Sequence, residues 1–175
     1  MPNLSHLRRI FLVGPMGAGK TTIGQLLAKH LDYGFLDSDR EIEDHTGATI
    51  PLIFQLEGEA GFRRREAHAI DELTQRDRIV LATGGGAVLR PENRNALSTR
   101  GAVIYLEATI EQLYQRTAKD RHRPLLQTAD PRAKLQELLL ERAPLYREVA
   151  RIVVDTTGKP TSAVVQEILD RLADC

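Results

Sequence analysis

Short runs of apolar residues alternate along the chain with longer stretches in which apolar residues recur every three or four positions. The short runs have the length of β-strands and lie at 10–13, 35–36, 79–82, 103–106 and 152–154. The longer stretches have helical spacing, most clearly in the set Val164, Val165, Ile168, Leu169 and Leu172. Strands that are apolar on both faces and alternate with helices are typical of a parallel sheet covered on both sides. The pattern therefore predicts an α/β fold with five parallel strands flanked by helices.

Two start signals support the predicted helices. Thr109 stands three residues before Gln112, which is the spacing of a capping box, and Pro91 suits the first position of a helix. The chain has 175 residues, with no internal repeat and no low-complexity tract or linker. We therefore expect a single domain over residues 1–175.

The sequence Gly-Pro-Met-Gly-Ala-Gly-Lys-Thr at 14–21 lies between the first predicted strand and the first predicted helix. It fits the pattern G-x-x-x-x-G-K-[ST] of a phosphate-binding loop, or P-loop. Glycines let the backbone N–H groups fold around a phosphate at the positive end of the following helix. Lys20 is then placed to reach the β- and γ-phosphates, and Thr21 to ligate Mg²⁺. The motif predicts binding of a nucleoside triphosphate but does not identify the reaction.

Two acidic residues follow the short run at 35–36. Asp37 and Asp39 would point to the same side if the extended chain continued past the strand, and strand ends in a parallel sheet face the ligand crevice. One acid could direct Mg²⁺ while the other takes a proton from an attacking hydroxyl. A helix N-cap is the alternative role for one residue within 37–39. Asp155, after the run at 152–154, is a second candidate for the metal, and we favour Asp37.

Two arginines are expected to turn inward. Glu66 lies on the apolar stripe of a helix that we expect to open at Gly61, and Arg63 stands three residues before it. Because a buried carboxylate needs a cation, the pair could hold Arg63 ready for an anionic substrate; a surface salt bridge is the alternative. Arg142 falls near the apolar face of its helix, where it must meet an acid or a bound anion. Glycines at 84–86 either allow close approach to a small ligand or form only a flexible turn.

Charge and composition narrow the class of partner. Twenty-four basic and 24 acidic residues leave no net charge, which argues against nucleic acid and against a membrane surface as partners. No stretch reaches the roughly 18 apolar residues that span a membrane. The only cysteine is Cys175, so we expect a cytoplasmic protein in a reducing compartment. The one local imbalance is a basic excess at 116–132, which is either a solvated face or part of a phosphate site.

Taken together, these motifs resemble those of shikimate kinases, and the resemblance covers essentially the whole chain. It is carried by GPMGAGKT at 14–21, FLDSD at 35–39, GFRRRE at 61–66, TGGG at 83–86, RPLL at 123–126 and RAPLY at 142–146. The resemblance implies a nucleoside-monophosphate-kinase-like fold with strand order 2-3-1-4-5, a substrate-binding region at about 37–66 and a mobile lid at about 118–132. It also implies a monomeric enzyme of aromatic amino-acid biosynthesis. Such an enzyme uses MgATP to phosphorylate the 3-hydroxyl of shikimate, giving 3-phosphoshikimate and ADP.

The resemblance further implies roles for individual residues. Asp39 corresponds to the contact with the substrate hydroxyl and to the base, and Asp37 to the acid that reaches Mg²⁺ through water, with Thr21 as the direct ligand. Arg63 and Arg142 correspond to the clamp on the shikimate carboxylate. The residues implied in catalysis are Asp39, Lys20 and the lid arginine Arg123. Those implied in binding shikimate are Asp39, Arg63, Gly84, Gly85, Gly86 and Arg142. Those implied in binding ATP are Gly17, Ala18, Gly19, Lys20, Thr21, Thr22, Arg116, Arg123 and Lys159, with Arg116 and Lys159 beside adenine.

Two rival functions use the same phosphate loop. A kinase of the same fold could act on gluconate or on a nucleoside monophosphate, although a nucleotide acceptor would not call for a carboxylate clamp. A nucleotide-dependent switch would hydrolyse ATP slowly, at a rate indifferent to any polyol. Without the resemblance, the spacing of the residues supports only a P-loop phosphotransferase that acts on a small anion.

Overall fold

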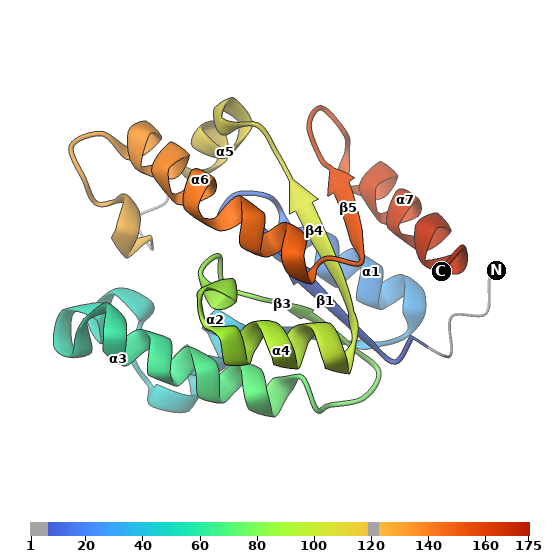
Figure 1. Ribbon diagram of the computed structural model, residues 1–175, viewed down its shortest axis with the longest axis horizontal. Coiled ribbons are helices and arrows are strands. Elements are labelled where there is room, and N and C mark those ends of the chain that lie inside the picture. The colour runs from blue at the N-terminus through green and yellow to red at the C-terminus, as the bar shows by residue number, and fades with distance from the viewer. Residues whose placement is uncertain (1–6, 119–122) are drawn as a thin grey trace.

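A parallel sheet forms the centre of the protein (Figure 1). The computed structural model describes residues 7–118 and 123–175. Its strands are β1 (Arg9–Val13), β2 (Gly34–Asp37), β3 (Ile79–Ala82), β4 (Ala102–Glu107) and β5 (Ile152–Asp155). All neighbouring strands pair in parallel, in the order β2-β3-β1-β4-β5. The five expected strands and their expected order are thus confirmed.

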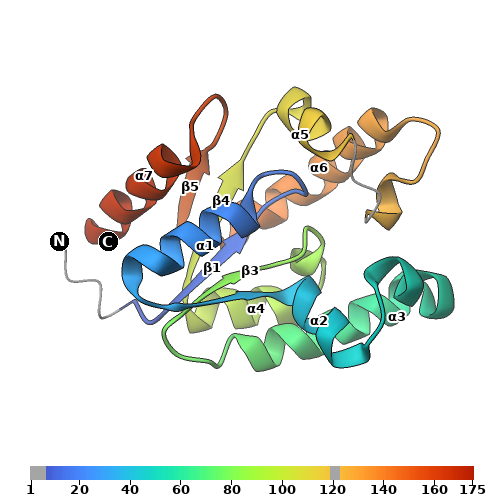
Figure 2. The same cartoon turned by 180° about the vertical axis from the view of Figure 1, so that it is seen from behind.

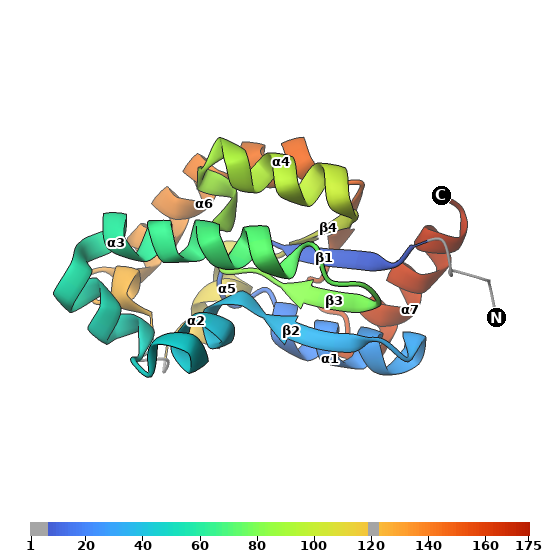
Figure 3. The same cartoon turned by 90° about the horizontal axis from the view of Figure 1, so that it is seen from below.

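Helices cover both faces of this sheet, as Figure 3 shows from below. One face carries α1 (Lys20–Leu31) and α7 (Thr161–Ala173), and the other carries α3 (Ile50–Leu73), α4 (Pro91–Arg100) and α6 (Pro131–Val149). Because side chains alternate along a strand, β1 supplies both cores. Ile10 and Leu12 pack with the first pair of helices, whereas Phe11 and Val13 pack on the other side. This burial on both faces explains why β1, β3 and β4 are apolar along nearly their whole length.

Four shorter elements lie toward the carboxyl ends of the strands (Figure 2). They are α2 (Ser38–Thr46), α5 (Ile110–Thr117) and the short 3₁₀ turns η1 (Ala87–Leu89) and η2 (Pro124–Leu126). The predicted starts are confirmed: Thr109 accepts a hydrogen bond from the backbone N–H of Gln112, and Pro91 is the first residue of α4. None of the helices in the two described ranges is long and apolar enough to cross a membrane.

The helix that carries Arg63 is preceded by a helical segment that the sequence did not predict. Helical structure in α3 begins at Ile50, with Thr49 as its N-cap. It is interrupted at Gly58, whose φ of 71° and ψ of 179° are not helical. Glycine adopts a positive φ at little cost, so the chain turns there and resumes its helix. The segment that contains Arg63 therefore begins just after Gly58, close to the start expected at Gly61, whereas the helical segment before Gly58 was missed.

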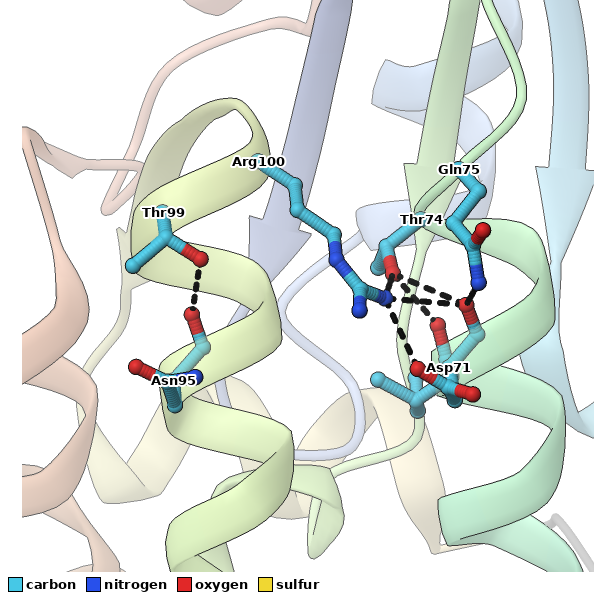
Figure 4. A network of polar contacts seen from close by, with 7 residues as sticks. Asp71, Thr74, Gln75, Asn95, Thr99 and Arg100 are labelled. Atoms are coloured by element: carbon cyan, nitrogen blue, oxygen red, sulfur yellow. Dashed lines mark hydrogen bonds and ion pairs between the residues drawn. The ribbon is translucent and has the colours of Figure 1, made fainter.

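A polar network fixes the far end of α3 against α4 (Figure 4). Arg100 Nη1 donates to Asp71 Oδ1 at 2.9 Å, to the Asp71 carbonyl at 3.0 Å and to Thr74 Oγ1 at 2.8 Å. These acceptors include a carbonyl in the last turn of α3, where a cation is favourable. The network holds in place the helix that carries Arg63 and Glu66 near its middle.

Candidate active site

The loops that follow the strands enclose one large pocket at the carboxyl edge of the sheet. Its volume is about 600 Å³. The predicted site residues in its lining are Gly17, Gly19, Lys20, Thr21, Thr22, Asp37, Asp39, Gly84, Gly85, Arg116 and Arg123. A smaller cavity shares Asp39, Gly84, Gly85 and Arg123 with it and adds Arg63, Gly86 and Arg142. Ligands in open α/β sheets bind at this edge, so the fold brings the predicted residues together where a site is expected.

The phosphate loop connects β1 to α1, as the motif predicts. Gly14, Gly17 and Gly19 have φ values of 148°, 86° and 94°, which side chains other than glycine rarely adopt. The ammonium group of Lys20 donates to the carbonyls of Gly14 at 2.7 Å and Pro15 at 2.9 Å. Burial and then the charge of Arg123 lower the pKa of Lys20 from 10.5 to about 7. A negatively charged ligand in the loop would favour the charged lysine and draw it from these carbonyls.

Thr21 and Asp37 meet directly at the start of the pocket. Thr21 Oγ1 donates to Asp37 Oδ2 at 2.9 Å. The other carboxylate oxygen accepts from the N–H groups of Asp39 at 3.0 Å and Arg40 at 3.2 Å, so Asp37 is the N-cap of α2. The extended chain ends at Asp37, so the condition for both acids to share one side of an extended chain is not met, and the alternative of a helix N-cap within 37–39 is confirmed for Asp37. Asp39 instead reaches the pocket from the first turn of α2, because capping by Asp37 turns the chain at once.

Hard oxygen ligands suit Mg²⁺, and the Thr21–Asp37 pair offers a hydroxyl and a carboxylate beside the phosphate loop. Over the described residues, no three His, Cys, Asp or Glu side chains gather as a metal site. An ion held here would therefore need the phosphates of a nucleotide to complete its coordination. The rival acid, Asp155, accepts a hydrogen bond from the N–H of Thr157 at 2.9 Å and does not line the large pocket.

Asp39 has an unusual environment for an ionisable group. Its Oδ1 oxygen is buried and, like Glu66 Oε2 and the Nε atoms of Arg63 and Arg142, has no hydrogen-bond partner within the described residues. Burial, followed by the negative charges of Glu66 and Asp37, raises the pKa of Asp39 from 3.8 to about 7. A carboxyl poised near neutral pH can accept a proton from a bound hydroxyl.

Glycines at 84–86 make room for the charged side chains of the site. A Cβ atom on Gly84 would lie 2.8 Å from Asp39 Oδ1 and 2.9 Å from Glu66 Oε2. A Cβ atom on Gly86 would lie 2.5 Å from Arg63 Nη1. At these distances a side chain would displace the charged groups, so glycine at both positions leaves Asp39, Glu66 and Arg63 where they are. The two readings from the sequence, a flexible turn or close approach to a ligand, both missed this packing against the protein's own charges.

The pair Arg63–Glu66 is buried rather than a surface salt bridge. Glu66 is 1% exposed, and its Oε1 oxygen accepts from Arg63 Nη1 at 2.8 Å. Burial raises the pKa of Glu66, while the charge of Arg63 opposes that rise. Arg63 Nη2 also lies 3.4 Å from the exposed Glu59. Arg142 is 3% exposed, which confirms that it turns inward.

A third hollow, of about 200 Å³, lies between α1, α5 and α7. It is lined by Ala18, Gly19, Thr22 and Arg116 from one side and by Thr156, Lys159 and Thr161 from the other. Arg116 donates to the Gly17 carbonyl at 2.9 Å, and Lys159 pairs with Glu167 at 2.9 Å. The hollow adjoins the phosphate loop on the side away from Asp39. It is therefore placed to take the end of a nucleotide that lies away from the γ-phosphate.

The lid predicted at 118–132 is described in part, since residues 119–122 lie outside the described ranges. Arg123 precedes η2 and lines both the large pocket and the smaller cavity. Leu126 packs into the core beside the first residues of α6, and Arg132 pairs with Glu111 of α5. The basic excess in this segment thus places at least one arginine at the phosphate side of the site.

Sequence reasoning missed several residues that shape the site. Ser38 is fully buried, and its hydroxyl accepts from the N–H of Gly84 at 3.0 Å, which ties the acidic segment to the glycine loop. A serine between two acids at a strand end could have indicated this role. The apolar part of the smaller cavity comes from Met16, Ile50, Phe54, Phe62, Pro124 and Leu125. Their apolar character gave no sign that they would line a cavity instead of the core.

Comparison with known proteins agrees with this geometry. The family model described as shikimate kinase matches residues 16–173. A shikimate kinase of Pseudomonas syringae pv. tomato is 61% identical over 96% of this chain and 98% of its own length. One of Bordetella pertussis is 59% identical over 97% of this chain and 80% of its own. The structure of shikimate kinase from Acinetobacter baumannii in complex with shikimate is 52% identical, covers 96% of this chain and 94% of its own, and superposes with a TM-score of 0.95. The chain has a P-loop after the first strand of a sheet with the order 2-3-1-4-5, and it matches these relatives along nearly its whole length. It therefore belongs to the shikimate kinase family.

Proposed function

We propose that this chain transfers the terminal phosphoryl group of ATP to the 3-hydroxyl of shikimate, releasing 3-phosphoshikimate and ADP. One observation carries the proposal beyond family membership. Four residues that line the small cavity each have a buried polar atom without a described partner, namely Asp39 Oδ1, Glu66 Oε2, Arg63 Nε and Arg142 Nε. Buried polar atoms are normally paired, so such a group indicates a polar ligand. Two guanidinium groups and a proton acceptor suit a small hydroxylated carboxylate.

At the acceptor end, Arg63 and Arg142 would hold the carboxylate of shikimate. Guanidinium groups bind carboxylates through paired, charge-assisted hydrogen bonds, and both arginines are buried enough to make those bonds strong. The two come from α3 and α6, on either side of the glycine loop at 84–86. The ring would lie in the small cavity that Gly84, Gly85 and Gly86 line. The acceptor would thus be oriented with its hydroxyls toward Asp39.

Asp39 would then act on the hydroxyl that is phosphorylated. Its carboxylate accepts the hydroxyl proton as the oxygen attacks the γ-phosphorus, the bond from that phosphorus to the bridging oxygen breaks, and ADP leaves with the electron pair. A pKa of about 7 leaves a large share of Asp39 ionised at neutral pH and keeps it basic enough to take the proton. Phosphoryl transfer depends mainly on position and charge, so holding the hydroxyl in line is the larger part of this role.

At the nucleotide end, residues 17–22 would bind the phosphates and Arg116 and Lys159 the adenine. Lys20 would leave the carbonyls of Gly14 and Pro15 to contact the β- and γ-phosphates. Arg123 would lie over the transferring group when the segment 118–132 closes, and closure would exclude water that competes as acceptor. Mg²⁺ would be held by Thr21 directly and by Asp37 through water, and when bound it offsets the charge of the phosphates.

All of these residues belong to one chain, and we propose that the chain works as a single kinase domain and as a monomer. Among the described residues, members of the phosphate loop at 14–21, of the acceptor region at 37–66 and of the lid segment from Arg123 onward line the two adjoining pockets, so one chain supplies each of these parts.

The direct test is release of ADP from MgATP by the purified protein, with shikimate, gluconate, CMP or no acceptor. We expect a shikimate-dependent rate on the order of 1–100 per second, the usual range for kinases. A comparable rate with gluconate or CMP, and none with shikimate, would overturn the assignment of shikimate as acceptor. It would leave the assignment of the phosphate loop to ATP unchanged. A slow rate that no acceptor changes would indicate a nucleotide-dependent switch.

A further inference from the structure

Tyr146 occupies a position that none of the proposed roles explains. It lies on α6, one turn beyond Arg142, and is 1% exposed. Its hydroxyl donates to the backbone carbonyl of Gly85 at 2.6 Å. A buried tyrosine hydroxyl normally finds such a partner, but this partner is the middle glycine of the loop that borders the acceptor cavity.

Gly85 lies at the junction between the two halves of the site. A Cβ atom built on it would be 3.5 Å from Arg142 Nη1 and 3.5 Å from the backbone N of Met16 in the phosphate loop. Holding the Gly85 carbonyl therefore holds the loop against both the acceptor arginine and the phosphate loop. Burial raises the pKa of Tyr146, and the positive charge of the nearby Arg142 opposes that rise. The phenol thus stays protonated and able to donate.

The hydroxyl is separable from the packing of the ring. The Tyr146 ring lies in the core cluster of α3, α4 and α6 and contacts the ring of Tyr105 on β4, with 5.0 Å between the ring centroids. A phenylalanine would fill the same space. The oxygen reaches the Gly85 carbonyl, so the oxygen serves the site and the ring serves the core.

We propose that Tyr146 is a positioning residue for the acceptor, because its hydroxyl fixes the Gly85 carbonyl in the loop that packs against the Arg142 guanidinium. The carboxylate of the acceptor meets Arg142 where the loop at Gly85 leaves that guanidinium. The inference rests on the proposed function and adds a residue that touches neither substrate.

The test is the steady-state kinetics of Tyr146→Phe beside Tyr105→Phe. Losing the hydroxyl leaves the buried Gly85 carbonyl without this donor, so we expect the KM for shikimate to rise about fivefold to tenfold. The KM for MgATP and kcat should stay within about twofold, because ground-state binding of the acceptor is what is lost. Tyr105→Phe removes the same atom from the neighbouring ring and should leave the KM for shikimate unchanged.

An unchanged KM for shikimate in Tyr146→Phe would overturn the inference. So would equal increases for both substrates, or the same increase in Tyr105→Phe, since either result would mean a general loss of structure. If Tyr146→Phe melts below the assay temperature, calorimetric titration with shikimate in the cold replaces the kinetics, with the same fold-change in Kd expected. Failure of the wild-type protein to use shikimate at all would refute the proposed function instead, so the two failures are distinguishable.

Discussion

Replacing Asp39 with asparagine should stabilise the unliganded protein while it abolishes most of the activity. The wild-type carboxyl has a pKa of about 7 in the fold against 3.8 in its absence. A carboxyl with a raised pKa binds its proton more tightly in the folded state, so its contribution to stability is full below pH 4 and is lost as the pH rises to 7. The asparagine of the variant has no proton to lose, so Asp39→Asn escapes this loss.

The size of the effect follows from the same shift. Wild-type stability falls by about 1.4 kcal/mol for each pH unit between pH 5 and the pKa of about 7, and little more above it. The free energy of unfolding of Asp39→Asn, relative to that of wild type, should therefore rise by about 2–3 kcal/mol from pH 5 to pH 8. For a chain of this length that corresponds to a relative rise in Tm of roughly 4–10 °C. The cost of burying the amide does not vary with pH, so the slope of the difference isolates the ionisation of Asp39.

Urea unfolding of both proteins at several pH values between 5 and 8, without ligands, measures the slope. Asp44→Asn is the matched control, because Asp44 is exposed on the same helix, and its difference from wild type should not follow this trend. A stability difference for Asp39→Asn that is flat with pH would refute the reasoning, because it would mean that Asp39 ionises as freely in the fold as in the unfolded chain. Turnover of the variant should fall about 10²-fold or more, the usual scale for a general base, and retained turnover would remove Asp39 from that role.

Three further substitutions test other parts of the site. Arg123→Ala should lower kcat about 10²-fold or more with an unchanged circular dichroism spectrum, because a cation on the transferring group acts mainly in the transition state; a change confined to the KM for ATP would contradict this. Arg142→Lys should raise the KM for shikimate about tenfold and leave the KM for ATP unchanged, since an ammonium group cannot form paired bonds to a carboxylate, and equal effects on both substrates would count against the clamp. Gly84→Ala should lower kcat/KM for shikimate more than tenfold, because its Cβ atom would displace Asp39 and Glu66. Gly34→Ala is the control and should retain full activity, because a Cβ atom there would lie no closer than 3.9 Å to its neighbours. Equal activity of the two variants would refute the spatial role of Gly84.

The sheet and the phosphate loop could be predicted almost completely from the sequence. Five apolar runs predicted five strands, most clearly for β1, β3 and β4, where burial on both faces removes polar residues. The loop at 14–21 was predictable because the geometry around a phosphate demands glycine at fixed positions. The inward turn of Arg142 was predictable from its place on the apolar stripe of its helix, which the structure confirms.

Other features depend on contacts between distant segments and left little trace in the sequence. The turn at Asp37 depends on which of three polar residues caps α2, and spacing alone did not decide this. Gly58 interrupts α3 because glycine adopts a positive φ there. Glycine also occurs inside many uninterrupted helices, so its presence alone did not predict the interruption. The need for Gly84 and Gly86 arises from Asp39, Glu66 and Arg63, which lie far away in sequence.

The central claim is that the two buried arginines select an acceptor with a carboxylate and present its hydroxyl to Asp39. The most direct measurement is the initial rate of ADP release with shikimate beside shikimate methyl ester, which keeps the hydroxyls but lacks the charge. We predict turnover with shikimate and a kcat/KM at least about 10²-fold lower with the ester, because both arginines would lose their charged partner. Equal use of the two compounds would contradict the account, since Arg63 and Arg142 would then have no carboxylate to bind.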